Sequence, residues 1–250
     1  MALQEELKTQ GDFLFKNRSY LPLIILVVGL SVYAYGKYTN TMCSSSCSME
    51  IYLYVSLVVS LFGQLIRVLT VGYTPHNTSG RNTSEGQVAG EVNSTGIYST
   101  VRHPLYLGNF FMWLGVAMIT ANAWFIVAFI LFYMFYYERI MYAEEAFLRN
   151  KFDRGYLDWA DRTPAIIPSF KKYEKSRYPF SLKKVLKMEK NGLVATFTLF
   201  WLFDYAGQII DTRQFNVEMN FWFYAAAASF VIYIIIKGMK SAGKLETKDR

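Results

Sequence analysis

The chain has 250 residues, of which 53% are hydrophobic and only 18% charged, against a charged share of about 25% in ordinary soluble domains. The apolar residues come in long blocks, and a helix needs roughly 20 mostly apolar residues to cross a membrane. This composition excludes an ordinary soluble domain. The net charge of +7 is therefore assigned to loops at a membrane surface, and nucleic acid is not expected as a partner.

Six apolar segments follow one another along the chain and predict about six transmembrane helices. They are Leu21–Tyr38, Ile51–Val71, Leu105–Thr120, Ala123–Tyr142, Leu193–Ile210 and Phe221–Ile236. Only Ala121 and Asn122 separate the third segment from the fourth, so these two should form a tight antiparallel hairpin. The expected fold is an all-α integral membrane protein that contains a helical hairpin.

Lysine and arginine are shared unevenly between the loops, and such residues favour the cytoplasmic side. The N-terminal segment, the loop after the second span, the stretch after the fourth and the tail are basic. The alternate loops hold only Lys37 and Arg213. Six spans with both termini in the cytoplasm satisfy this pattern, so we expect a multi-pass protein with that orientation.

Cys43 and Cys47 fall in a loop that this orientation places outside. They are either unpaired loop thiols or a disulfide, which an oxidising compartment would allow. Two thiols alone cannot complete a four-ligand zinc site, and no metal site is predicted.

The fourth segment should continue beyond the membrane. Ala123–Phe152 contains no Pro or Gly, and as one helix it would be about 45 Å long against a hydrocarbon core of about 30 Å. Its last third would then stand in the cytosol with Glu138, Glu144 and Glu145. Three prolines interrupt the Lys- and aromatic-rich stretch that follows, which we expect to lie on the membrane surface as far as Gly192.

Arg102, His103 and Pro104 stand just before the third segment. Pro104 suits the first position of a helix, where no N–H is needed. Arg102 and His103 would then lie at the helix N-terminus, whose free N–H groups attract anions. Because two cations at that end do not stabilise the helix, they indicate a carboxylate or phosphate ligand. The alternative is that Arg102 contacts a lipid headgroup and His103 caps the helix.

Glu138 and Glu145 are seven residues apart and share one face of the protruding helix, with Tyr142 between them. Acids in this position could hold the ribose hydroxyls or the amino group of a ligand. The alternative is a solvated helix whose acids pair with Arg139 and Arg149.

Together these motifs resemble the isoprenylcysteine carboxyl methyltransferase family and the wider group of integral membrane phospholipid methyltransferases. The resemblance runs from about Gly96 to Phe170. It is carried by Arg102-His103-Pro104-x-Tyr106-x-Gly108, a hydrophobic hairpin, and Glu144-Glu145-x-x-Leu148-x-x-x-Phe152-x-x-x-Tyr156-x-x-Trp159-x-x-Arg162-x-Pro164-x-x-x-Pro168. Asp153 stands where the family often has Gly, and Trp159 where Tyr is common. We accordingly expect a core at residues 96–170, between an N-terminal two-span region (1–95) and a basic C-terminal two-span region (171–250).

The resemblance implies a cytoplasmic pocket for S-adenosylmethionine between the mouth of the third span and the protruding helix. By this resemblance, the residues that hold the cofactor or line its pocket are His103, Pro104, Tyr106, Leu107, Glu144 and Glu145. Arg162 matches the arginine that faces the acceptor in the family, and Arg102 is expected to join it in catalysis.

The implied activity is methyl transfer to the carboxylate or phosphate of a lipid or lipidated acceptor. Candidates are a prenylated carboxylate, a lipid phosphate such as that of lipid A, or an amine headgroup. O-methylation is favoured, because an anion is already a nucleophile whereas an amine would need a base. Arg162, with Arg81 or Arg67, would position the anion through two parallel hydrogen bonds.

Two other functions are compatible with the sequence. Membrane sterol-type reductases that use NADPH share a similar Arg-His-Pro pattern. A small non-enzymatic transporter would use Arg67 and Asp204, since charges within membrane spans are functional candidates. The plainer interpretation is that Arg67 and Asp204 pair with each other or lie near the cytosolic end.

Overall fold

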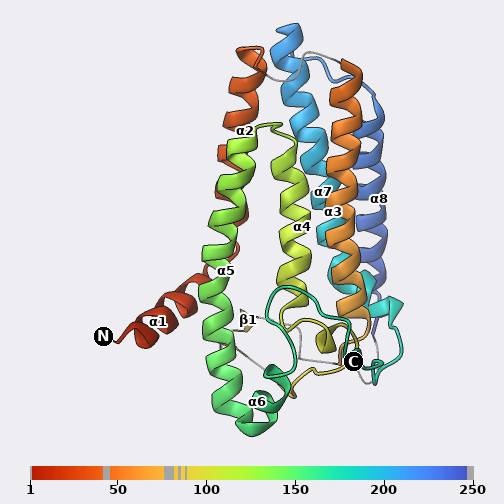
Figure 1. Cartoon of the computed structure of the whole chain (residues 1–250). Helices are drawn as coiled ribbons and strands as arrows, with labels where there is room; N and C mark the ends of the chain where they lie inside the picture. The colour runs from red at the N-terminus through yellow and green to blue at the C-terminus, as the bar shows by residue number, and fades with distance from the viewer. Residues whose placement is uncertain (1, 42–45, 76–81, 84–85, 88, 247–250) are drawn as a thin grey trace.

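The structure is a computed structural model that describes residues 2–41, 46–75, 82–83, 86–87 and 89–246. Cys43, Arg81 and the side chain of Cys47 lie outside the described residues, so the predictions about them stay predictions. The regular structure of the described residues is helical apart from one β-hairpin, whose two strands have two residues each (Figure 1). Its elements are α1 (Leu3–Lys16), α2 (Leu21–Tyr38), α3 (Ser46–Gly72), β1 (Asn82–Thr83), β2 (Gly86–Gln87), the 3₁₀ helix η1 (Gly96–Ser99), α4 (Pro104–Met118), α5 (Ala123–Phe152), α6 (Arg154–Ala160), α7 (Leu182–Thr212) and α8 (Phe221–Ser241).

Five helices are long and apolar enough to cross a membrane, namely α2, α3, α5, α7 and α8. The sixth apolar helix, α4, is shorter, with 15 residues. All six run alongside one another in a single bundle (Figure 1). Each predicted apolar segment falls on one of these helices. The prediction of an all-α, multi-pass membrane protein is confirmed.

The short turn between α4 and α5 forms the predicted hairpin. The Asn122 side chain accepts a hydrogen bond from the backbone N–H of Phe125 at 2.9 Å and so caps α5. Thr120 Oγ1 donates to the carbonyl of Ala117 at 2.8 Å. In Figure 1 this turn lies short of the upper ends of α2, α3 and α7.

Small residues let α4 approach α3 closely. A Cβ added to Gly63 of α3 would overlap the carbonyl oxygen of Gly108 on α4. Further along the same contact, Ser60 Oγ donates to the carbonyl of Met112 at 2.9 Å. Small side chains are a common means of close packing between membrane helices, where no hydrophobic force drives association. This contact fixes α4, and with it the residues that precede its first turn.

The N-terminal helix α1 has no counterpart among the predicted elements. It projects sideways from the bundle and crosses α5 (Figure 1). Gly11 and Phe15 are its buried residues, and Tyr136 of α5 donates a hydrogen bond to the carbonyl of Leu14 at 3.1 Å. One apolar face is thus enough to hold a mostly polar helix against α5.

The expectation of a surface stretch as far as Gly192 is wrong for residues 182–192, because α7 begins at Leu182. The Ser181 side chain accepts from the backbone N–H of Lys184 and caps the helix. Lys184 is buried, and its Nζ donates to the carbonyl of Thr74, just beyond α3, at 2.6 Å. α7 is therefore anchored to the end of α3 before its apolar part starts.

Candidate active site

The motif residues gather at the lower end of the bundle in Figure 1, where α5 extends past the other helices toward α6. Arg102 and His103 directly precede α4, and Pro104 is its first residue, as predicted. Glu144 and Glu145 lie on the last third of α5 and contact these residues across the gap between the two helices. The structure therefore brings the two motifs together.

Glu145 receives a hydrogen bond on each of its oxygens. Arg102 Nη1 donates to Oε2 at 2.8 Å, and His103 Nε2 lies 2.8 Å from Oε1. His103 is the N-cap residue of α4, as the alternative interpretation expected, but its side chain forms no hydrogen bond with the helix N–H groups. Its imidazole is instead buried between the two helices and held in one orientation.

Glu144 forms the second half of the same cluster. Tyr106 donates to Glu144 Oε2 at 2.9 Å, and His103 Nδ1 lies 3.7 Å from that oxygen. The rings of His103 and Tyr106 are stacked with centroids 5.6 Å apart. Tyr133 Oη donates to the backbone carbonyl of Tyr106 at 2.8 Å, which ties the first turn of α4 to α5.

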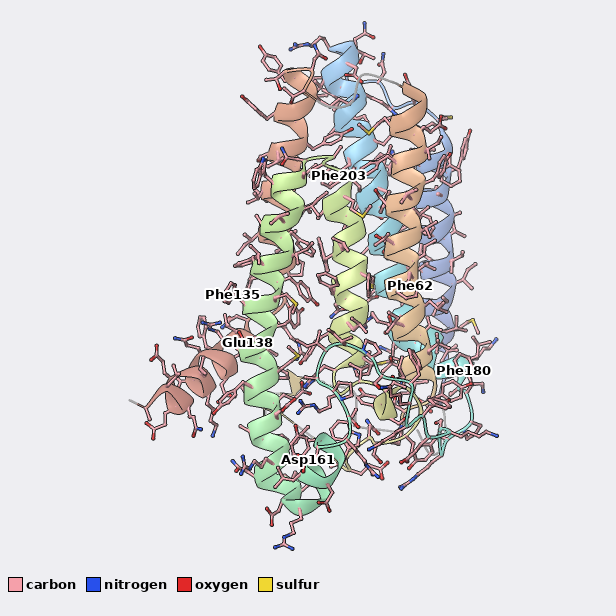
Figure 2. All side chains as sticks on the ribbon, in the orientation of Figure 1. Phe62, Phe135, Glu138, Asp161, Phe180 and Phe203 are labelled. Carbon is pink, nitrogen blue, oxygen red and sulfur yellow. The ribbon has the colours of Figure 1, made fainter. Side chains whose placement is uncertain are left out.

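Glu138 does not join this cluster, although it shares a helix face with Glu145. It is exposed and lies close to where α1 crosses α5 (Figure 2). Arg139 donates to Gln10 of α1 at 2.9 Å rather than to an acid of α5. The alternative interpretation, in which the acids of α5 pair with arginines of the same helix, is therefore wrong for Glu144 and Glu145.

One buried polar atom beside Glu145, Arg102 Nε, has no hydrogen-bond partner within the described chain. The Tyr156 hydroxyl lies close to both Glu145 and Arg102. Burial and the nearby negative charge of Glu145 raise the pKa of Tyr156 above its usual value. The hydroxyl therefore stays protonated beside the carboxylate of Glu145. Unsatisfied buried groups are rare in folded proteins, and Arg102 Nε points to a ligand with polar atoms.

Pro104 and Leu107 occupy the first turn of α4. Pro104 is fully buried, whereas Leu107 is half-buried and its N–H bonds to the carbonyl of His103 at 3.1 Å. Trp159 of α6 donates from Nε1 to the carbonyl of Tyr98 in η1 at 3.1 Å. These residues give the polar cluster apolar and aromatic surroundings.

Arg162 lies apart from the cluster. Its side chain is half exposed, and Nη1 is 3.7 Å from Glu174 Oε1, a distance typical of a weak ion pair. With Trp159, Lys172 and other residues it lines a small hollow at the surface. The backbone N–H of Arg102 donates to the carbonyl of Pro164 at 2.9 Å and ties this segment to the cluster. Arg162 is thus adjacent to the Glu145 cluster without contacting it.

A second polar cluster inside the bundle was not predicted. Arg67 of α3 donates from Nε and Nη2 to the two oxygens of Glu189 on α7, both at 2.8 Å, and from Nη1 to Asn109 of α4 at 2.7 Å. The suggested pairing of Arg67 with Asp204 is wrong, because Asp204 accepts hydrogen bonds from Gln208 and Asn220.

Glu189 was missed because the sequence places it before the apolar block of its helix, among lysines. The signal that could have revealed it is charge balance. Arg67 lies within an apolar span and needs a partner, and buried charges are almost always paired.

Part of this chain is similar to known proteins. Residues 51–155 match the family model described as phospholipid methyltransferase. This region includes Arg67 and the Glu145 cluster and ends before Arg162. No solved structure matches the chain.

Several curated proteins are similar to this chain. The Tribolium castaneum protein-S-isoprenylcysteine O-methyltransferase is 31% identical over 48% of this chain and 43% of its own length. The Arabidopsis thaliana protein-S-isoprenylcysteine O-methyltransferase B is 37% identical over 29% of this chain and 37% of its own length. The Oryza sativa subsp. indica probable protein-S-isoprenylcysteine O-methyltransferase is 34% identical over 46% of this chain and 60% of its own length.

The chain thus spans between 37% and 60% of the length of these relatives. The family model and the similar proteins all carry the names of methyltransferases. They confirm the resemblance of this chain to the isoprenylcysteine carboxyl methyltransferases and the wider membrane phospholipid methyltransferases.

Proposed function

We propose that this protein is a membrane methyltransferase that uses S-adenosylmethionine to methylate an anionic group of a lipid or lipidated acceptor. The observation that carries the proposal is the cluster in which Glu144 and Glu145 meet Arg102, His103 and Tyr106. The likeness to isoprenylcysteine O-methyltransferases supports the reaction type.

The chemistry of the cluster fits this cofactor. S-adenosylmethionine carries a carboxylate, an amine, ribose hydroxyls and an adenine. Arg102, with a buried free Nε, and His103 are donors for the carboxylate. Glu144 and Glu145 are acceptors for the amine and the hydroxyls. Tyr106, with Pro104 and Leu107 in the same helical turn, would supply walls for the adenine.

The chain's own part in the reaction is alignment and desolvation. When bound, S-adenosylmethionine supplies an electrophilic methyl group that passes to an acceptor oxygen as the carbon–sulfur bond breaks and sulfur keeps the electron pair. A carboxylate or phosphate oxygen already carries the attacking pair, so the protein has no proton to remove. O-methylation is the outcome that this arrangement favours.

The acceptor would be held by the hollow next to the cofactor cluster. Arg162 and Lys172 line it, and the ion pair of Arg162 with Glu174 is long and half exposed. An acceptor anion can therefore replace Glu174 at little cost. The chemical classes that fit are a prenylated carboxylate, a lipid phosphate or another anionic headgroup. From the excess of Lys and Arg in the matching loops, we place this face and both termini in the cytoplasm.

The cofactor assignment can be tested by calorimetry with S-adenosylhomocysteine on the purified full chain. His103→Ala and Glu145→Ala each remove a hydrogen bond to a charged group, roughly 1.5–3 kcal/mol, so affinity should fall about ten- to a hundredfold. Glu138→Ala removes an exposed acid of the same helix and should bind like the wild type. Equal binding by all four proteins would exclude this pocket.

The activity itself can be tested with S-adenosylmethionine labelled in its methyl group. The label should enter the lipid or lipidated fraction of a total membrane extract. Label released by mild base would indicate a carboxyl methyl ester, whereas base-stable label lies on a phosphate or an amine, and mass spectrometry of the labelled product distinguishes these two. Incorporation on an amine would refute O-methylation, and no incorporation from any extract would refute the proposed function.

A further inference from the structure

Four lysines gather where the first turns of α7 lie beside the last turns of α8. Lys187 and Lys190 are three residues apart on α7, and Lys237 and Lys240 are three residues apart on α8. Residues at this spacing share a helix face, and α7 packs against α8. Lys190 accordingly feels the repulsion of the other three charges. We call this group the four-lysine cluster.

The cluster has no acidic partner within the described residues. None of its four side chains forms a salt bridge there. Lys190 Nζ donates to the backbone carbonyl of Lys187 at 2.8 Å, and Lys237 Nζ lies over the ring of Tyr233 at 5.8 Å. The nearby Glu189 is buried and bonded to Arg67 on both oxygens. Among the described residues, no acid therefore compensates this positive charge.

The position of the cluster indicates a lipid rather than a soluble anion. Lys187 and Lys190 come just before the apolar part of α7, and Lys237 and Lys240 end the apolar helix α8. Directly beyond the lysines, α8 exposes an apolar surface that includes Phe230, Val231, Ile234 and Ile235, each of them more than half exposed. Cations next to an apolar face match an anionic headgroup with its acyl chains.

We propose that the four-lysine cluster binds the phosphate headgroup of an anionic lipid whose acyl chains lie along the exposed face of α8. This site is separate from the Glu145 cluster, and its occupation does not depend on methyl transfer. It lies on helices outside the region that matches the methyltransferase family. The bound lipid would offset the repulsion among the lysines and hold α7 and α8 together.

The test uses the full chain, purified in neutral detergent and titrated with dioleoyl phosphatidic acid or dioleoyl phosphatidylcholine, with bound lipid counted by native mass spectrometry. We expect tighter binding of phosphatidic acid. Since a lysine near a membrane surface contributes about 1 kcal/mol, the pair Lys190→Gln and Lys240→Gln should weaken this binding about 25-fold. Replacing the same two lysines by Arg keeps the charge and should keep the binding.

The matched control is Lys8→Gln with Lys16→Gln, two exposed lysines of α1 whose removal lowers the net charge by the same amount. The control should bind phosphatidic acid like the wild type. An equal loss in the control pair, or no loss in the Lys190 and Lys240 pair, would overturn the proposal. Full competition by glycerol 3-phosphate at the concentration of the lipid would identify a soluble phosphate site and overturn the lipid assignment.

Discussion

The buried pair of Arg67 and Glu189 offers the sharpest test of how the interior of the bundle is built. Two hydrogen bonds of 2.8 Å join the two side chains, which are 22% and 5% exposed. Glu189→Gln keeps the shape but leaves a mostly buried guanidinium without its counter-charge. Breaking such a pair from one side costs about 3–5 kcal/mol. The variant should therefore unfold at a markedly lower temperature than the wild type.

Replacing both partners separates stability from function. Arg67→Met combined with Glu189→Leu removes both charges and fills the space, which is commonly neutral or stabilising in buried pairs. Stability can be followed by thermal unfolding in detergent, and the two single variants with the double variant form a complete cycle. If Arg67 also positions the acceptor, the double variant should be stable and bind S-adenosylhomocysteine normally, but transfer methyl groups poorly.

Two results would refute this reasoning. A loss below about 1 kcal/mol in Glu189→Gln would show that water reaches the pair, since exposed ion pairs contribute only that much. Full activity of the stable double variant would show that Arg67 has a structural role alone and leave Arg162 as the candidate for acceptor binding.

Three further predictions concern the acceptor side, the helix packing and the orientation. Arg162→Lys should leave binding of S-adenosylhomocysteine unchanged but reduce methyl transfer by orders of magnitude, because Lys cannot form the two parallel hydrogen bonds of a planar guanidinium. A proportional loss of both binding and transfer would show that Arg162 belongs to the cofactor pocket. Gly63→Ala should reduce the free energy of unfolding by about 1–3 kcal/mol and so lower the unfolding temperature. Gly238→Ala is the control, because nothing lies near the added Cβ, and it should have no such effect. Equal effects of the two substitutions would contradict the close α3–α4 contact. Cys43 and Cys47 should react with an impermeant thiol reagent from outside intact cells, after reduction if they are paired. Labelling only from the cytosolic side would show that the orientation is the opposite of the predicted one.

The apolar pattern of the sequence correctly predicted the helices that form the bundle. α2 and the full length of α5 have the predicted bounds. For α5 the reasons are local, since Asn122 caps its start and neither Pro nor Gly interrupts it. The pattern failed for α1 and for the first three turns of α7, which are polar and depend on tertiary contacts. In α7, the decisive contact is between Lys184 and the end of α3, and no local signal reveals it.

The candidate site could also be predicted in part from local sequence patterns. Arg102 and His103 were placed at a helix start and Glu145 on a protruding helix, and the structure joins them directly. The sequence did not reveal which of the two acids, Glu138 or Glu145, would contact Arg102 and His103, since both lie on one face of α5. In the structure Glu145 lies level with Arg102 and His103 at the start of α4, whereas Glu138 is exposed near α1, and this placement depends on the three-dimensional packing.

The short turn between α4 and α5 has a consequence for how the protein enters the bilayer. No charged residue occurs from Pro104 to Tyr137. The polar groups of the turn are bonded within it, by Asn122 at the start of α5 and by Thr120 at the end of α4. Both arms of the hairpin can therefore be inserted from one side as a preformed unit, without moving a charge through hydrocarbon. Insertion of α4 and α5 then requires only this short uncharged turn to cross the bilayer.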